Sequence, residues 1–278
     1  MKNLLFLFIS AATGYAATFP TEYQAALQLY VSNKIPEASV AFNALIASAP
    51  NAQTKDLALM QASYCEAQLK HPEQATTLAA GITDKHLGTL CRMKILVLQS
   101  KYAEILALVK NEDLSLWPDA LIFDALMVRG DASGRARDVV SAEKDFRAAL
   151  GHTLNDYKKA TAHLRLAWLL EGPQALDDLE EVMKLKEPGP TMRYQAIAAR
   201  ARILALNGKG ELAIGEFERI NELTKQPHWT MVQMALAATH ETLGEPDKAK
   251  SCYEAVVASK NPPPDLLATA KAKLETKR

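Results

Sequence analysis

The sequence is short of several residue types, and each shortage argues against a class of protein. Only 6% of the 278 residues are aromatic, and runs of alternating β-branched residues are missing, which argues against an extensive β-sheet. Lysine plus arginine equals aspartate plus glutamate at 32 each, so no net positive charge attracts nucleic acid. Alanine and leucine, which are strong helix formers, dominate what remains. The composition therefore predicts an all-α protein that does not bind nucleic acid.

Motifs that carry chemistry are also scarce. The six histidines are scattered, no cysteine pair has metal-ligand spacing, and neither a nucleophile elbow nor a phosphate loop occurs. Ser141 to Lys144 match S-x-x-K, but the K-T-G and S-D-N sequences that accompany this pattern in penicillin-binding enzymes are absent. The acidic pairs Asp177-Asp178 and Glu180-Glu181 fit a solvated helix face. The sequence predicts no catalytic residue, no metal site and no cofactor.

Only three cysteines occur, at positions 65, 91 and 252, an odd and scattered set that does not suggest a disulfide framework. The better expectation is that each is a small buried hydrophobe on a helix. A bridge between Cys65 and Cys91 stays open as the alternative.

The only strongly apolar run lies at the N-terminus. MKNLLFLFISAATGYAA has one lysine, a short apolar stretch and an alanine-rich end, which is typical of a secretory signal peptide. We expect residues 1–17 to be this peptide, cleaved after Ala16 or Ala17, although an uncleaved anchor is the alternative. No cysteine follows that could carry a lipid. The mature chain is predicted to be periplasmic or secreted, with no integral membrane segment.

What the sequence has in quantity is a repeated pattern. In LGEPDKAKSCYEAVV, a turn precedes a small residue, Ala249, and an aromatic residue, Tyr253, follows four positions later. Each copy follows a helical stretch with apolar residues at i, i+3, i+4 and i+7, so the unit is a helix, a turn and a second helix. The pattern recurs as Ala38 with Phe42, Ala142 with Phe146 and Ala213 with Phe217, with weaker copies around Ala75, Ile105 and Ala175. We call these seven small or apolar residues the anchors, and their mean spacing is about 35 residues.

This pattern resembles the tetratricopeptide repeat (TPR) family, whose unit is a helical hairpin of about 34 residues. The resemblance implies a right-handed α-solenoid of about seven hairpins over residues 18–262, in which the anchors, their aromatic partners and Gly244 pack the repeats. Residues 263–278 would form a capping helix or a frayed tail. The chain departs from the family in three places: the aromatic and glycine signature of the first helix is mostly absent, Ile105 stands where a small residue is expected, and an insertion is expected at Gly130–Asp138. Sel1-like or other α-solenoid repeats are the alternatives.

Such an array implies a binding role. The first helices of the hairpins are expected to line a concave surface that docks a protein or peptide, although several of the same residues could simply pack between helices. We therefore predict a non-enzymatic scaffold of the bacterial cell envelope. The alternatives are an adaptor that holds polysaccharide or cell-wall machinery, or an enzyme site at the Gly130–Asp138 insertion beside Trp117-Pro118. The candidate partner-binding residues are Tyr23, Tyr30, Tyr64, Lys94, Tyr157, Arg202 and Glu241.

Overall fold

The computed structural model describes residues 21–170, 172–224, 230–260 and 262–275, and every regular element within them is a helix. The predicted signal peptide, residues 1–17, lies outside this part of the chain. The chain divides into two compact units, which we call the N-terminal unit (Met1–Leu154) and the C-terminal unit (Asn155–Arg278). The hairpins predicted over residues 18–262 are thus shared between two units.

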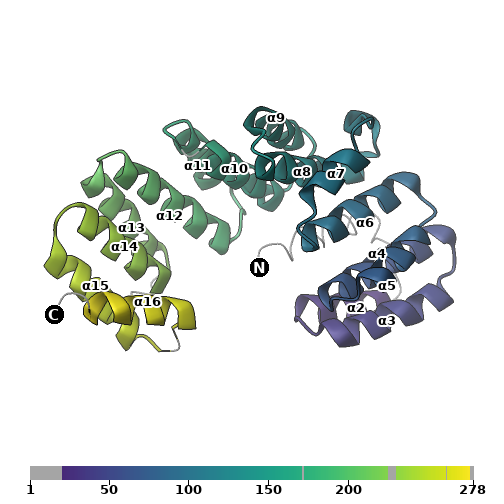
Figure 1. Ribbon diagram of the computed structural model, residues 1–278, viewed down its shortest axis with the longest axis horizontal. Helices are drawn as coiled ribbons and strands as arrows, with labels where there is room; N and C mark the ends of the chain where they lie inside the picture. The colour runs from purple at the N-terminus through teal and green to yellow at the C-terminus, as the bar shows by residue number, and fades with distance from the viewer. Residues whose placement is uncertain (1–20, 171, 225–229, 261, 276–278) are drawn as a thin grey trace. The chain divides into compact units, whose positions relative to one another are not determined.

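Over residues 21–154, the N-terminal unit has four helical hairpins (Figure 1, purple to teal). In each, a short turn joins a first helix to the second helix that packs against it, and α6 also packs against the first helices before and after it, α4 and α8. The hairpins are α2 (Thr21–Val31) with α3 (Ile35–Ser48), α4 (Ala52–Gln68) with α5 (Pro72–Ala80), α6 (Lys85–Leu98) with α7 (Tyr102–Leu108), and α8 (Asp119–Arg135) with α9 (Val139–Leu150).

In its described residues, the C-terminal unit has three hairpins and a last helix (Figure 1, teal through green to yellow). The helix α16 (Pro264–Glu275) packs against both helices of the preceding hairpin and buries Ala270 in their core, as expected of a cap. The all-helical hairpin architecture is therefore confirmed. The hairpins are α10 (Asp156–Leu170) with α11 (Ala175–Lys184), α12 (Pro190–Leu206) with α13 (Gly210–Thr224), and α14 (Thr230–Thr242) with α15 (Pro246–Ala258).

Six of the turns inside hairpins have the same backbone structure. In the turn after α14, the N–H of Glu245 donates to the carbonyl of His240, and the N–H of Gly244 donates to that of Glu241. These two bonds and the positive φ of Gly244 define a Schellman motif, which satisfies carbonyls at the end of a helix. The residues with positive φ in these turns are Asn33, Lys70, Ser100, Arg137, Gly208 and Gly244. Each lies five residues before an anchor, so these turns all place the anchor at the same distance from the end of the first helix.

The residues predicted to pack the repeats lie where helices meet. Gly244 differs from the others because it serves the turn, with a φ of 72° and no atom near the position of a Cβ. The other predicted residues are all buried: Ala38, Phe42, Ala142, Phe146, Ala213, Phe217, Ala249 and Tyr253.

The expected insertion at Gly130–Asp138 is wrong. The helix α8 continues to Arg135, so only Ala136 to Asp138 form the turn. Gly130 lies inside the helix, and a Cβ there would lie 2.6 Å from Cε1 of Phe146, so the glycine allows α8 and α9 to approach closely. The longer connection lies instead before α8, where residues 109–118 include the 3₁₀ helix η2 (Leu114–Leu116). Trp117 is buried there, with its ring centroid 5.1 Å from that of His86.

Two further sequence predictions concern the cysteines and the membrane. Cys65 and Cys91 are buried and unbridged, and Cys252 is half-buried with a free thiol. Among the helices of the described residues, not one combines the length and the apolar character that crossing a membrane requires.

Candidate functional site

The N-terminal unit brings four of the predicted binding residues together. Nζ of Lys94 on α6 donates to Oδ2 of Asp124 on α8 at 2.6 Å, and it lies 5.9 Å from the ring centroid of Tyr64 on α4. On the neighbouring helix α2, Oη of Tyr30 accepts a hydrogen bond from Nε2 of Gln68. Tyr23 and Tyr30 both lie close enough to Tyr64 to raise its pKa. First helices therefore align these residues in a row, as the repeat register predicts.

This row is not accessible, however. Tyr23, Tyr30, Tyr64 and Lys94 are each no more than 2% exposed, although the prediction placed them on a surface open to a partner. Burial is also the main cause that raises the pKa of Tyr64. These polar side chains can be buried because they have polar partners inside the unit. Asp124 neutralises the ammonium of Lys94, and the Tyr30 hydroxyl accepts a hydrogen bond from Gln68. As they lie, these four side chains stabilise the unit and offer no surface for docking.

The C-terminal unit is different, because its first helices keep exposed side chains. Trp168 near the end of α10 is 60% exposed, and Leu206 at the end of α12 is 73% exposed. Arg202 lies one turn before Leu206 and is also exposed, as are Ala238 and Thr242 at the corresponding positions of α14. The helix α12 packs against both α10 and α14. We call Trp168, Arg202, Leu206, Ala238 and Thr242 the open face.

Buried residues fix the alignment of α10 with α12. Ala160, Leu164 and Ala167 are buried, as are the residues 37 positions later, Ile197, Ala201 and Leu204. The same offset places Arg165 in the position that corresponds to Arg202. The same offset also places Trp168 at the position of Ala205, one residue before Leu206. The open face thus has a large exposed apolar side chain on each of two adjacent helices, with Arg202 on the second of them, whereas Arg165 is partly buried.

Two other predicted binding residues, Tyr157 and Glu241, lie outside the open face. Tyr157 is half-buried against the core of the unit, where burial raises its pKa to about 12 and Arg165 opposes the rise. Glu241 accepts a hydrogen bond at 2.9 Å from Nζ of Lys273, so it ties α14 to the cap α16. Of the seven candidates, Arg202 is the one that lies on the open face.

Sequence reasoning missed a set of charged and polar side-chain pairs that join the helices of a hairpin. Nε and Nη2 of Arg129 on α8 donate to Asp145 on α9 at 2.8 and 2.7 Å. Nδ1 of His163 on α10 lies 2.9 Å from Oδ1 of Asp178 on α11. Asp178 is buried, which corrects the expectation of a solvated acid. The sequence contains a signal for these pairs, because Asp145 and Asp178 each stand three residues after an anchor.

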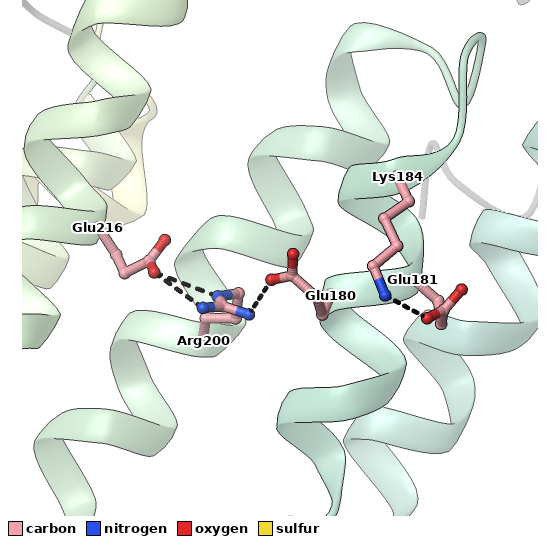
Figure 2. A network of polar contacts seen from close by, with 5 residues as sticks. All are labelled: Glu180, Glu181, Lys184, Arg200 and Glu216. Carbon is pink, nitrogen blue, oxygen red and sulfur yellow. Dashed lines mark hydrogen bonds and ion pairs between the residues drawn. The ribbon is translucent and has the colours of Figure 1, made fainter.

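The third pair also joins two hairpins. Arg200 on α12 donates to Glu216, again three residues after an anchor, at 3.1 and 3.2 Å. Its Nη1 also donates to Glu180 on α11 of the preceding hairpin at 2.6 Å, so the guanidinium lies between two carboxylates, as Figure 2 shows. Glu181 beside it pairs with Lys184 on the same helix. Arg200 therefore fixes the stacking of one hairpin on the next.

A cavity of about 390 Å³ lies among the N-terminal halves of α4, α6 and α8. Its apolar walls are Leu57, Leu87 and Leu121. Its carboxylate, Asp56, accepts three hydrogen bonds from Thr83 and Asp84. These bonds hold the connection between α5 and α6 in place, so the acid has a structural role.

The described residues outside these sites were also searched for a metal centre or a catalytic group. Across residues 21–170, 172–224, 230–260 and 262–275, no three histidine, cysteine, aspartate or glutamate side chains come together as a metal site would need. In the S-x-x-K pattern, the Ser141 N–H donates to Asp138 at 3.1 Å. That contact caps α9 at its N-terminus.

Comparison with known proteins gives a limited result. No protein-family model matches the chain, and no curated protein matches it. Among solved structures, the chain is similar to the crystal structure of the P58(IPK) TPR domain, at 12% sequence identity and a TM-score of 0.27. That match covers 92% of this chain and 98% of the other. The fold described above rests on the helices and their packing in this chain.

Proposed function

We propose that the chain is a protein-interaction scaffold whose C-terminal unit binds a protein segment on the open face. The observation that carries this proposal is the exposure of Trp168 and Leu206 beside Arg202, on adjacent first helices. Large apolar side chains in water are costly when they are grouped, and tryptophan and arginine are the residue types most enriched at the energetic centres of interfaces. A partner that covers them would remove that cost.

Site-specific photo-cross-linking tests this proposal. A benzophenone amino acid replaces Trp168 or Leu206 in one set of variants, and Leu212 on α13 or Lys250 on α15 in the control set. Leu212 is a matched control because it is also a leucine and is 61% exposed, but it belongs to a second helix. We expect one protein adduct at Trp168 and Leu206 and none at the control positions. Equal cross-linking at both sets, or none at either, would reject the open face as the binding site.

We further propose that the chain is exported to the bacterial cell envelope and acts there. The support is the charge and apolar pattern of residues 1–17. Mass spectrometry of the protein from fractionated cells provides the test. The expected product begins at Ala17 or Thr18 and lies outside the cytoplasmic fraction. A product that retains residues 1–17 in the cytoplasm would contradict export, without affecting the open face.

A further inference from the structure

The cavity among the N-terminal halves of α4, α6 and α8 is lined by two kinds of side chain. Leu57, Leu87 and Leu121 form apolar walls and are each no more than 8% exposed. The polar lining consists of one amide, one hydroxyl and two carboxylates, supplied by Gln53, Thr83, Asp56 and Asp84. Three of these four residues are exposed, so the cavity is open to solvent at its polar side. Its volume of about 390 Å³ is within the range of small-molecule sites.

The polar side of the cavity has more hydrogen-bond acceptors than it uses. Oδ1 of Asp84 accepts the N–H of Leu87, and Oδ2 has no partner among the described residues. The side-chain amide of Gln53 likewise has no partner there. Oδ1 of Asp56 accepts one hydrogen bond, from the Thr83 N–H, although a carboxylate oxygen can accept two. The cavity therefore offers acceptors to a ligand that brings its own donors.

The two carboxylates also determine which charge the cavity attracts. The ends of α4 and α6 each carry roughly half a positive charge, which alone would favour an anion. Asp56 and Asp84 each add a full negative charge close to these ends, which outweighs it. Among the lining residues there is no lysine, arginine or histidine, and the nearby Lys85 pairs with Glu112 at 3.0 Å instead. A cation should therefore be attracted to the cavity, and an anion should be repelled.

From these observations we infer that the cavity binds an ammonium group on a short aliphatic stem. An ammonium has three N–H donors and no acceptor, so it complements the unused acceptors of Asp84 and Gln53. Its methylene groups pack against the three leucine side chains, which removes apolar surface from water. A free primary amine and the lysine side chain of another protein both have this chemistry. The inference does not depend on the open face, which belongs to the other unit.

Nuclear magnetic resonance of the full chain with ¹³C-labelled leucine methyl groups provides the test. The probes are n-butylamine, 1-butanol and pentanoate, which share a four-carbon stem and differ in the head group. We expect butylamine to shift the methyl signals of Leu57, Leu87 and Leu121 saturably, with an affinity at least about fivefold above that of butanol. Pentanoate should cause no shift. Equal affinity for butanol, or no saturable shift with butylamine, would overturn the inference.

Asp84→Asn separates the charge of the cavity from its structure. Asparagine caps helices as well as aspartate does, so α6 should keep its N-cap and the melting temperature should not change. We expect butylamine to bind at least about fivefold more weakly. Asp138→Asn is the matched control, because Asp138 caps α9 by the same bond, from the N–H three residues later, but lies outside the cavity. It should bind butylamine as the wild type does.

A second variant keeps the test decisive if the cap of α6 is disturbed. Gln53→Leu removes an unused acceptor from an exposed residue that bonds to no described side chain, so the fold should be unaffected. Weaker binding of butylamine by this variant would support the site. Wild-type affinity in both Asp84→Asn and Gln53→Leu would contradict it.

Two further probes distinguish the sources of the ammonium group. Putrescine represents a free amine, and Nα-acetyl-lysine methylamide represents a lysine within a polypeptide. Saturable shifts of the three leucines by putrescine alone would support a small amine as the ligand. Shifts by the lysine derivative at similar concentrations would support the lysine of a protein. If neither compound shifts these signals, the inference is wrong, whatever the outcome of the cross-linking at the open face.

Discussion

At the residue scale, the hairpin of α8 and α9 depends on a contact between a large ring and a small neighbour. Phe146 is buried on α9, and its ring occupies the space that a side chain at position 130 would need. Gly130 is therefore retained inside a helix, where glycine normally costs about 1 kcal/mol relative to alanine because of its backbone freedom. The close approach of α8 and α9 offsets that cost.

The substitution Gly130→Ala tests this contact. The new Cβ would lie 2.6 and 2.9 Å from two ring carbons of Phe146, so the ring or the helix must move. We expect a loss of about 1–3 kcal/mol in the free energy of unfolding, measured by denaturant titration. Gly215→Ala is the matched control, because it lies inside α13 with no atom within 4 Å of the new Cβ. That control should gain about 0.5–1 kcal/mol from helix propensity, and a similar gain at position 130 would contradict the contact.

At the scale of the element, the turn determines where each second helix begins. The same Schellman motif occurs in six hairpins, but only two of them place glycine at the residue with positive φ. In the left-handed region a Cβ is crowded by the following carbonyl, so other residues cost about 1–2 kcal/mol there. The turns after α4 and α8, with Lys70 and Arg137, therefore hold backbone strain that the rest of the hairpin offsets.

Substitutions at the residue with positive φ in these turns should raise stability where they introduce glycine and lower it where they remove glycine. Lys70→Gly and Arg137→Gly are each expected to raise the free energy of unfolding by up to about 1 kcal/mol, since both side chains are exposed and the strain is removed. Gly208→Ala and Gly244→Ala are expected to lower it by about 1 kcal/mol, although no atom lies near either new Cβ. Thermal melts monitored by circular dichroism measure all four. Destabilisation by Lys70→Gly would mean that the lysine side chain makes a contact of greater value than the strain.

Some features of the helices could be predicted from the sequence, and others could not. The anchors were predictable because a small residue and a ring four positions later lie on one helix face, and a local pattern is sufficient to show that. The course of α8 was not predictable, because Gly130 and Gly134 read locally as turn residues and only the contact with Phe146 explains one of them. The exposure of side chains on the first helices was the least predictable feature. Tyr64 and Arg202 both belong to the first-helix row, yet neighbouring helices bury one and leave the other in water.

At the scale of the whole molecule, stability is distributed along the hairpins. The C-terminal unit has three successive hydrophobic clusters, each built by neighbouring helices, as in repeat proteins whose units stabilise only their neighbours. Both units bury groups that ionise at alkaline pH, Tyr253 of the C-terminal unit among them, but the N-terminal unit buries more of these groups. Burial raises the pKa of Cys65 and Cys91 to about 12, and it raises the pKa values of Tyr23, Tyr30 and Tyr64. The N-terminal unit should therefore lose more stability at high pH than the C-terminal unit does.

We expect the N-terminal unit to lose stability as the pH rises above about 9. The folded state holds the protons of Cys65 and Cys91 up to a pKa of about 12, whereas the unfolded chain releases thiol protons near pH 8.5. The unfolded state thus binds fewer protons between these values. The stabilisation is complete below the unfolded pKa and is lost as the pH approaches 12. Denaturant titrations at pH 7, 9 and 10.5 should show a falling midpoint for the N-terminal unit.

A variant identifies the groups that are responsible for the alkaline loss. Cys91→Ala removes one buried thiol, so the midpoint should fall less steeply between pH 9 and 10.5, even if the variant is less stable at pH 7. The comparison of slopes at two pH values separates proton release from the loss of packing, which is independent of pH. Reaction with a disulfide reagent gives a second readout, because the buried thiols should react only at the rate of unfolding while Cys252, which is half-buried, reacts first. A midpoint that stays constant to pH 10.5, or fast labelling of Cys65 and Cys91 at pH 7, would show that the first helices of this unit do not shield these thiols from water.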